Sequence, residues 1–253
     1  MPVYEQPLNE RVRTLMRLDV LFSQLNNSIH GESEWDSRNS IHTLLDILNI
    51  VTRMDIKKEI IKELERHSSY LAKLESNPNI NQSTLGEVLN DLDLQIDRMH
   101  TLNGQVAQRL RENDFLSSIR QRATIPGGAC HFDLPGYHYW LMQPAQKRIT
   151  DLQDWMNEFA PIKSSISLIL RLIRESTMPT REIAEAGFFQ SSLDSSIPYQ
   201  LIRVTISPGS NHYAEISAGK HRFTVRFLDP DSSDQRPAQT SEDVEFDLTC
   251  CAI

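Results

Sequence analysis

The sequence predicts an α+β protein in which an N-terminal multi-helix domain is followed by an antiparallel β-sheet domain. A change in hydrophobic period predicts this order. From about residue 8 to 176, apolar residues mostly recur at the spacing of an amphipathic helix. From about residue 186 they alternate with polar residues, as in strands buried on one face. We therefore expect a mainly helical domain over residues 1–180 and an antiparallel β domain over residues 181–253.

The first helix is predicted by apolar side chains that share one face. These are Val12, Leu15, Leu18, Phe22 and Leu25. A second helix is expected over roughly residues 40–52, and a third after a break near residues 53–55. Because proline disfavours helical geometry in the residue before it, we expect the third helix to end at Asn77-Pro78.

Two further signals place the remaining helices. The segment Thr84-Leu-Gly-Glu87 has the form of a capping box, so we expect a helix to begin there. Its apolar pattern continues past a weak point at Gly104 to Leu110. The last two helices are predicted over about residues 149–159 and 161–173, with Pro161 in a first-turn position that tolerates proline.

The segment 123–144 interrupts the helical pattern. Prolines and glycines are concentrated in it, at Pro126, Gly127, Gly128, Pro135, Gly136 and Pro144. Such a density of helix-breaking residues argues against a helix anywhere in the segment. We expect an ordered crossover that is irregular or contains short strands.

In the C-terminal part, alternating apolar residues predict strands over residues 201–206, 212–217, 220–227 and 244–250. Turn-forming residues and a polar acidic loop separate them. We expect these hairpins to form one antiparallel sheet that is buried on one face. Residues 4–7 are expected to add a further strand.

Composition excludes several classes of protein. The chain of 253 residues has 26 Lys and Arg against 34 Asp and Glu, a formal net charge of -8, so it is a poor general binder of nucleic acid or anionic lipid. Three cysteines are too few for a disulfide framework. The N-terminus lacks the apolar core of a signal peptide, and no apolar run reaches the length of a membrane span. We expect reduced thiols, a cytoplasmic location and no membrane insertion.

Motifs for cofactor or metal chemistry are absent from the sequence, so we expect neither. Gly127-Gly128 lacks the Lys-Ser/Thr of a phosphate-binding loop, and there is no His-Glu-x-x-His or Cys-x-x-Cys. Cys130, with His131, Asp133 and His138 nearby, supports an alternative hypothesis of a thiol-dependent enzyme. Because neighbouring side chains in an extended chain point to opposite faces, a small buried thiol beside a polar loop is favoured.

The positions of the basic residues are the informative feature of this acidic chain. Arg13 and Arg17 lie four residues apart, away from the apolar stripe of the first helix. Others lie at a helix break, at the entry to the crossover, and on one face of a predicted strand. Arginine forks in this arrangement suit an acidic peptide. The set comprises Arg13, Arg17, Arg53, Arg120, Arg122, Lys220, Arg222 and Arg226.

An alternative interpretation needs no ligand. Glu245 and Asp247 alternate with the apolar residues of the last strand, so they could pair across strands with Arg222 and Arg226. For the first helix, the alternative is an ordinary solvated face. For Trp140, Trp155 and Tyr139, packing in the core or at a domain interface is the default. A nucleic-acid module that uses the basic residues is a further alternative, which the net charge disfavours.

Several longer motifs resemble one known family. They include Pro7-Leu-Asn-Glu-Arg-Val-Arg-Thr14, Ile119-Arg-Gln-Arg-Ala-Thr-Ile-Pro-Gly-Gly128, His138-Tyr-Trp-Leu141, His221-Arg-Phe-Thr-Val-Arg-Phe227 and Phe246-Asp-Leu-Thr-Cys-Cys251. With this combination, nearly end to end, the chain resembles the ZapD family of bacterial cell-division proteins.

The resemblance implies a cytoplasmic, non-enzymatic homodimer at the mid-cell division ring. It also implies a helical domain and a β domain, binding to the C-terminal tail of the tubulin-like GTPase FtsZ, and bundling of FtsZ filaments. The family's peptide site is attributed to a positively charged surface. The matching positions here are Arg13, Arg17, Arg53, Arg120, Arg122, His138, Arg222 and Arg226. Aromatic groups near His138 and Trp140 are expected to take the apolar side chains of the peptide.

Overall fold

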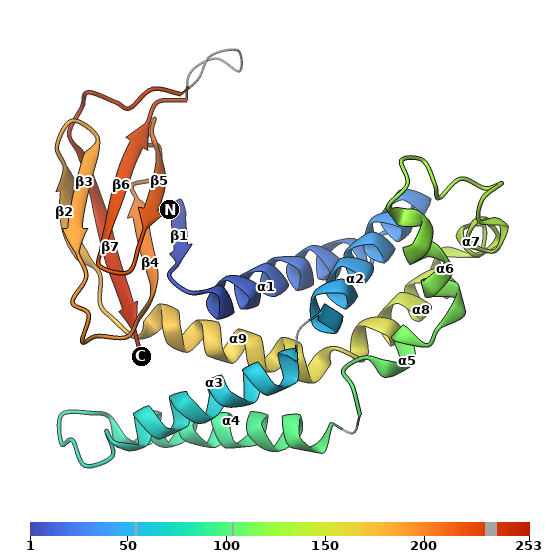
Figure 1. The fold of residues 1–253 in the computed structure, drawn as a ribbon, viewed down its shortest axis with the longest axis horizontal. Helices are drawn as coiled ribbons and strands as arrows, with labels where there is room; N and C mark the ends of the chain where they lie inside the picture. Colours follow the sequence, from blue (N-terminus) through green and yellow to red (C-terminus); the bar gives the residue numbers. More distant parts are fainter. Residues whose placement is uncertain (54, 103, 231–236) are drawn as a thin grey trace. The chain divides into compact units, whose positions relative to one another are not determined.

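The computed structural model describes residues 1–53, 55–102, 104–230 and 237–253. It confirms the predicted α+β class, with helices followed by antiparallel strands (Figure 1). In chain order the elements are β1 (Val3–Pro7), α1 (Glu10–Ser28), α2 (Glu34–Arg53), α3 (Ile56–Ala72), α4 (Gln82–Thr101), α5 (Gln108–Arg111), α6 (Asp114–Ala123), α7 (Pro135–Leu141), α8 (Ala145–Asn157), α9 (Ala160–Glu175), β2 (Thr180–Ala184), β3 (Phe188–Ser192), β4 (Tyr199–Ile206), β5 (Tyr213–Ala218), β6 (Arg222–Leu228) and β7 (Val244–Ala252).

The chain forms two compact units. The β unit contains residues 1–14 and 170–253, and the helical unit contains residues 15–169. The borders between the units therefore fall within α1 and within α9. The β unit includes the N-terminal strand β1, which confirms the strand expected near residues 4–7.

The β unit contains two antiparallel sheets, so the expectation of one sheet was wrong. One sheet has the strand order β1-β4-β7-β2, and the other has the order β3-β6-β5 (Figure 1). Phe227 of β6 meets Phe246 of β7 with ring centroids 5.2 Å apart, within a core to which both sheets contribute. Two sheets that each have one apolar face bury both faces when they pack together, which a single sheet cannot do.

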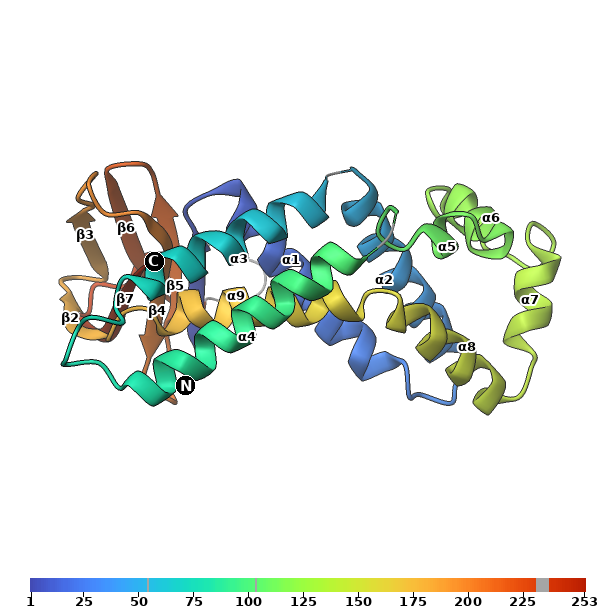
Figure 2. The ribbon, with the colours of Figure 1, turned by 90° about the horizontal axis from the view of Figure 1, so that it is seen from below.

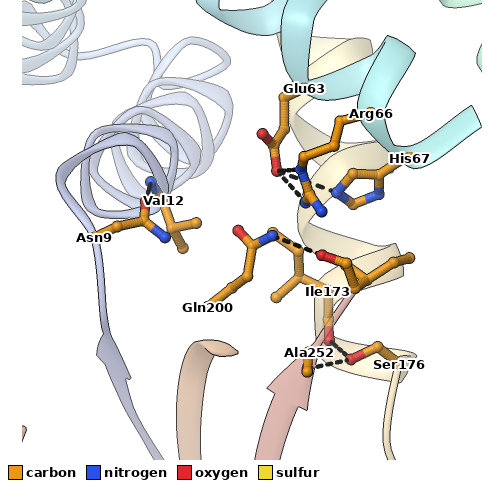
Figure 3. Close-up of polar contacts among 10 residues, drawn as sticks. Asn9, Val12, Glu63, Arg66, His67, Ile173, Ser176, Gln200 and Ala252 are labelled. Carbon is orange, nitrogen blue, oxygen red and sulfur yellow. Dashed lines mark hydrogen bonds and ion pairs between the residues drawn. The ribbon is translucent and has the colours of Figure 1, made fainter. Parts of the chain in front are cut away.

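Within the β unit, polar contacts satisfy the ends of α1, α9 and β7 (Figure 3). The Asn9 side chain caps α1 by accepting a hydrogen bond of 2.9 Å from the Val12 N–H. Ser176 Oγ donates to the carbonyl of Ile173 at 2.8 Å and accepts from the N–H of Ala252 at 3.1 Å. These bonds satisfy backbone groups that the ends of a helix or strand leave unpaired.

A carboxylate joins β1 to its surroundings in the same unit. Glu5 lies opposite Arg203 in the β1–β4 register and accepts from its Nε at 2.9 Å. Arg174, near the end of α9, donates to both Glu5 oxygens at 3.0 and 2.9 Å. One carboxylate therefore holds two guanidinium groups and ties the N-terminal strand to α9 and β4.

In the helical unit, the break near residues 53–55 is confirmed, because α2 ends at Arg53 and Asp55 caps α3. Helices α3 and α4 lie side by side as an antiparallel pair (Figure 2). Helix α3 ends at Ala72, several residues before the predicted stop at Asn77-Pro78. The residues after Lys73 form turns, so Pro78 follows the helix end without causing it.

The predicted start of the next helix was also displaced. Helix α4 begins at Gln82, and its N-cap is Asn81, whose side chain accepts from the N–H groups of Ser83 and Thr84 at 3.1 and 3.2 Å. Asparagine is among the strongest N-cap residues, so the capping-box pattern at Thr84 lies inside a helix that is already capped. Gly104 and Ala107 have positive φ angles, and α5 is a separate short helix.

The segment 123–144 contains a helix, contrary to the expectation of an irregular or short-strand crossover. Helix α7 spans Pro135–Leu141, and no strand occurs among the described residues of this segment. Pro135 occupies the first turn, where the N–H that proline lacks would have no partner within the helix. Proline in this segment therefore starts a helix, whereas the prediction treated it only as a helix breaker.

A buried charged cluster lies on one face of α3 (Figure 3). Glu63 and His67 are completely buried, and Glu63 accepts from the Arg66 guanidinium. The His67 Nε2 lies 3.2 Å from Glu63 Oε1, and burial lowers the pKa of the His67 imidazole below its usual value of 6.5. Desolvation penalises the protonated ring more than the Glu63 hydrogen bond favours it.

Candidate functional site

The basic residues identified in the sequence fall in both units, and each group is described within its own unit. Arg13, Lys220, Arg222 and Arg226 belong to the β unit. The helical unit carries the others, namely Arg17, Arg53, Arg120, Arg122 and His138.

Strand β6 presents two arginines on the outer face of its sheet, as its alternation predicted. Arg222 and Arg226 are exposed, while the intervening core positions are buried. Arg226 lies between Phe188 of β3 and Glu215 of β5 in the strand register, and its guanidinium forms an ion pair with Glu215. Within the described residues, no carboxylate lies within 4.0 Å of the Arg222 guanidinium. Lys220 precedes β6 in a turn, so it is not a member of the strand as predicted.

The predicted pairing of Glu245 and Asp247 with these arginines was wrong. Strand β7 belongs to the other sheet, where its carboxylates lie beside Arg181 of β2. Arg181 donates to Glu245 at 2.7 Å and to Asp247 at 3.1 Å. These hydrogen bonds, led by the one to Glu245, raise the pKa of the Arg181 guanidinium. The carboxylates of β7 therefore have Arg181 as their partner and do not pair with the arginines of β6.

The two arginines of α1 differ in their local partners. Arg13 forms an ion pair with Glu10, one turn earlier on the same helix. Arg17 is exposed and, among the described residues, has no ion-pair partner. Both avoid the buried stripe of Val12, Leu15 and Leu18, as the helical spacing predicted. Arg17 is therefore the more available cation of the two.

Two adjoining cavities bring basic residues of the helical unit together. The first, of about 390 Å³, is lined by Arg53, Lys57 and Arg111, with Asp55 as its acidic member. The second, of about 610 Å³, is lined by Arg111 and Arg120, with Glu112 as its acidic member. Both cavities include Thr52, Gly104, Gln105 and Arg111. Arg53 and Arg120, 67 positions apart in the sequence, thus line neighbouring concave surfaces with an excess of positive charge.

Arg111 lines both cavities but was not identified from the sequence. It is the last residue of α5, a helix of four residues that is too short to show a hydrophobic period. The two arginines Arg109 and Arg111, separated by Leu110, were the available signal. Arg109 forms an ion pair with Glu158 at 2.9 Å, whereas Arg111 faces the cavities.

A third cavity of about 590 Å³ lies between α2, the α6–α7 connection and α7. We call it the Trp35 cavity. Its lining residues are Glu34, Trp35, Arg38, His42, Ala123, Ile125, Pro126, Gly127, Gly128, Ala129, Cys130, His131 and His138. Arg122 lies just outside this lining, 3.7 Å from Asp133. Of the predicted site residues, the Trp35 cavity includes only His138.

The aromatic residues near His138 are not all available to a ligand. Trp140 is only 8% exposed and donates from its indole N–H to Asp151 at 3.0 Å. It packs against Phe115, Tyr137 and Trp155, which confirms the core interpretation for Trp140. Trp140 itself is therefore not available to a peptide, which leaves the expectation to the aromatic groups near it. Tyr139, by contrast, is 70% exposed and does not pack in the core.

A buried arginine holds the surroundings of the Trp35 cavity in place. Arg148 of α8 is buried and donates to the Ser37 hydroxyl at 2.9 Å and to the Glu32 carbonyl at 2.6 Å. It also donates to the carbonyls of Leu141 and Gln143, at the end of α7. Neutral groups satisfy this guanidinium, and they join α8 to the start of α2 and the end of α7.

The geometry around the cysteines does not assemble a thiol site. Cys130 is half-buried, and within the described residues no hydrogen bond joins its thiol to a histidine. Burial raises the pKa of the Cys250 and Cys251 thiols to about 11, which disfavours their reactive thiolate forms. Within the same residues, no three His, Cys, Asp or Glu side chains come together to hold a metal ion.

Comparison with known proteins identifies a family. The family model described as "ZapD: Cell division protein" matches residues 16–226. A cell division protein ZapD of Methylococcus capsulatus is 44% identical to this chain, over 99% of this chain and 98% of the relative. The ZapD proteins of Coxiella burnetii and Janthinobacterium sp. are 39% and 37% identical, over 99% and 100% of this chain and 97% and 100% of theirs. No helix in the described part of this chain has the length and apolar character needed to cross a membrane.

Proposed function

Because the chain belongs to the ZapD family of cell division proteins, we propose that it is a division scaffold that binds the acidic C-terminal tail of FtsZ. Basic side chains on its surface bind the carboxylates of the tail. Through this contact the protein bundles FtsZ filaments at the mid-cell division ring, in the cytoplasm. It acts without a cofactor and without enzymatic activity of its own.

One observation carries the proposal: on a chain with a net charge of -8, several predicted cations have no carboxylate partner among the described residues. These are Arg17, Arg53, Arg120, Lys220 and Arg222. Arg13, Arg122 and Arg226 each lie within 4.0 Å of a carboxylate of the chain itself. An exposed ion pair contributes little to stability, so an acidic ligand can compete for these three as well.

The cavities that Arg53, Arg111 and Arg120 line are the part of the surface best suited to a carboxylate-rich ligand. A concave basic surface focuses the electrostatic potential, and guanidinium forks bind carboxylates bidentately. Arg222 and Lys220 supply a second basic surface on the β unit.

Bundling requires at least two binding faces for each particle. A homodimer with two-fold symmetry presents the same basic surface twice, so it can contact two filaments. The affinity of one site for one tail can stay modest, because a filament displays many tails and avidity multiplies weak contacts. We expect bundling, measured by light scattering, to fall steeply as salt rises and screens the charges.

The experiment compares charge reversals at the cavities, on β6 and at a control position. Arg53→Glu and Arg120→Glu are each expected to weaken the binding of a synthetic FtsZ tail peptide by about tenfold at low salt, measured by calorimetry. The double variant Arg222→Glu, Arg226→Glu is expected to abolish binding if the β6 surface belongs to the site. Lys73→Glu, an exposed reversal just after α3, is the matched control and should leave affinity unchanged.

Two results would contradict the proposal. If wild-type protein binds no tail peptide at low salt, the partner is wrong. If Lys73→Glu weakens binding as much as Arg53→Glu and Arg120→Glu, binding depends on net charge and not on a site. Cys130→Ala should bundle filaments normally, because the scaffold has no use for the thiol.

A further inference from the structure

The Trp35 cavity is open and its walls expose apolar side chains. Trp35 is 76% exposed and Ile125 is 47% exposed, and both line it. Pro126 and two alanines, Ala123 and Ala129, add further apolar surface. Large apolar side chains gathered around one concave surface mark an interaction site far better than single exposed residues do.

The walls of the cavity are held by contacts that do not involve a ligand. Arg38 donates through Nε and Nη2 to Glu34 at 2.9 and 2.7 Å, and its guanidinium lies over the Trp35 ring at 5.6 Å. Its Nη1 reaches the carbonyl of Ala129 at 3.5 Å, on the opposite wall. A pre-formed cavity binds a ligand with little loss of conformational freedom.

Two glycines shape the connection that forms one wall. Gly127 has φ +71°, a conformation that side-chain-bearing residues rarely adopt. A Cβ atom at Gly128 would lie 2.5 Å from the carbonyl oxygen of Arg122, so the chain can pass there only without a side chain. The path of residues 123–131 is thus set locally, and Arg148 joins α2 to the end of α7.

The charged groups around the cavity are compatible with the binding of an acidic peptide. Glu34 is the only carboxylate among the lining residues, and it already accepts two hydrogen bonds from Arg38. The lining also includes Arg38, Cys130 and three imidazoles, those of His42, His131 and His138. If a peptide places an apolar side chain in the cavity, a carboxylate beside that side chain in the peptide would lie near imidazole hydrogen-bond donors. It would meet no carboxylate of the lining that lacks a partner.

We infer that the Trp35 cavity is the apolar subsite of the peptide-binding surface, and that it receives one aliphatic or aromatic side chain of a bound acidic peptide. This inference rests on the proposed function, since the peptide is the FtsZ tail. It assigns specificity to the cavity and electrostatic attraction to the cations of the helical unit, such as Arg53 and Arg120. Trp35, and not the buried Trp140, is the aromatic contact.

The test separates apolar from electrostatic binding by their salt dependence. Trp35→Ala in the full chain is expected to weaken binding of the synthetic FtsZ tail peptide by about tenfold, at low and at high salt alike. The effect of Arg53→Glu should shrink as salt rises. Tyr70→Ala is the matched control, because Tyr70 is an aromatic residue on α3 that is 43% exposed and lies outside the cavity.

A set of peptides then locates the contact. Each apolar residue of the tail is replaced by serine in turn. One replacement should weaken binding to the wild-type protein but cause no further loss with Trp35→Ala, since the interaction is already absent. Ile125→Ser should reproduce the behaviour of Trp35→Ala, and circular dichroism should show that both variants fold.

Unchanged peptide affinity in Trp35→Ala and Ile125→Ser, with the effect of Arg53→Glu intact, would overturn the subsite and leave the proposed function standing. A changed oligomeric state of Trp35→Ala in sedimentation, with peptide affinity unaltered, would assign the cavity to contact between copies of the chain and would also overturn the inference. Absence of peptide binding to the wild-type protein would reject the proposed function and the subsite together.

Discussion

The outer face of β6 and the cavities beside α5 carry the same kind of side chain in different surroundings. On β6, Arg226 lies directly opposite Glu215, so the strand register itself supplies a counter-charge. Around the cavities, Arg53, Arg111 and Arg120 come from separate helices and converge on concave surfaces. On the sheet, the register places a carboxylate beside Arg226, whereas the junction of helix ends gathers three arginines around cavities in which Asp55 and Glu112 are the acidic members.

The first and largest expected effect tests whether the helices around the Trp35 cavity depend on one buried group, Arg148. Arg148→Met should lower the free energy of unfolding by about 3 kcal/mol, because several buried carbonyls lose their donor. Chemical denaturation followed by circular dichroism measures this loss.

Arg181→Met is the control on the β unit, since Arg181 bonds only through exposed ion pairs. Its denaturation midpoint should match that of the wild type. An Arg148→Met protein as stable as the wild type would show that the buried guanidinium is dispensable for holding α2, α7 and α8 together around the Trp35 cavity.

A smaller effect is expected from pH, through α3 in the helical unit. The pKa of buried His67 is lowered, so the unfolded chain binds the proton more readily than the folded chain does. The stability that the neutral His67 provides is therefore complete above about pH 6.5, the usual value, and declines as pH falls below it, by at most about 1.4 kcal/mol per pH unit. The midpoint of denaturation should follow this decline.

His67→Gln should flatten the pH dependence between neutral pH and pH 5 relative to the wild type. His30→Gln, at an exposed histidine, should leave it unchanged. Parallel pH profiles for wild type and His67→Gln would mean that His67 does not titrate differently in the folded and unfolded chains.

The smallest expected effect concerns the ion pair between Glu215 and Arg226 on the β-unit surface. Glu215→Gln removes the counter-charge of Arg226 and should raise the affinity for the FtsZ tail peptide about threefold at low salt. Glu245→Gln is the matched control, because Glu245 pairs with Arg181 in the other sheet. Equal gains in both variants would indicate a response to net charge, and no gain in Glu215→Gln would place Arg226 outside the site.

Much of the candidate site could be predicted from residue type and spacing. Alternation along β6 placed Arg222 and Arg226 on an exposed face, and helical spacing kept Arg17 away from the apolar stripe. The partners of these residues could not be predicted. Glu245 has the correct alternation to meet Arg222, but its strand lies in a different sheet. Arg111 and Trp35 could not be identified as site residues from the sequence, because their place in the site comes from cavities that distant segments enclose.

The sequence therefore determined the features that depend on local interactions. The change from helical to strand period, the break at Arg53 and the exposed side of β6 each arise within one turn or one strand. The folded molecule alone decided that there are two sheets, that Glu215 and not Glu245 faces Arg226, and that Trp140 is buried while Trp35 is open. Strand order and helix packing bring together residues that are far apart in the chain. The free energy of these contacts depends on the complete tertiary structure, so no local segment determines it.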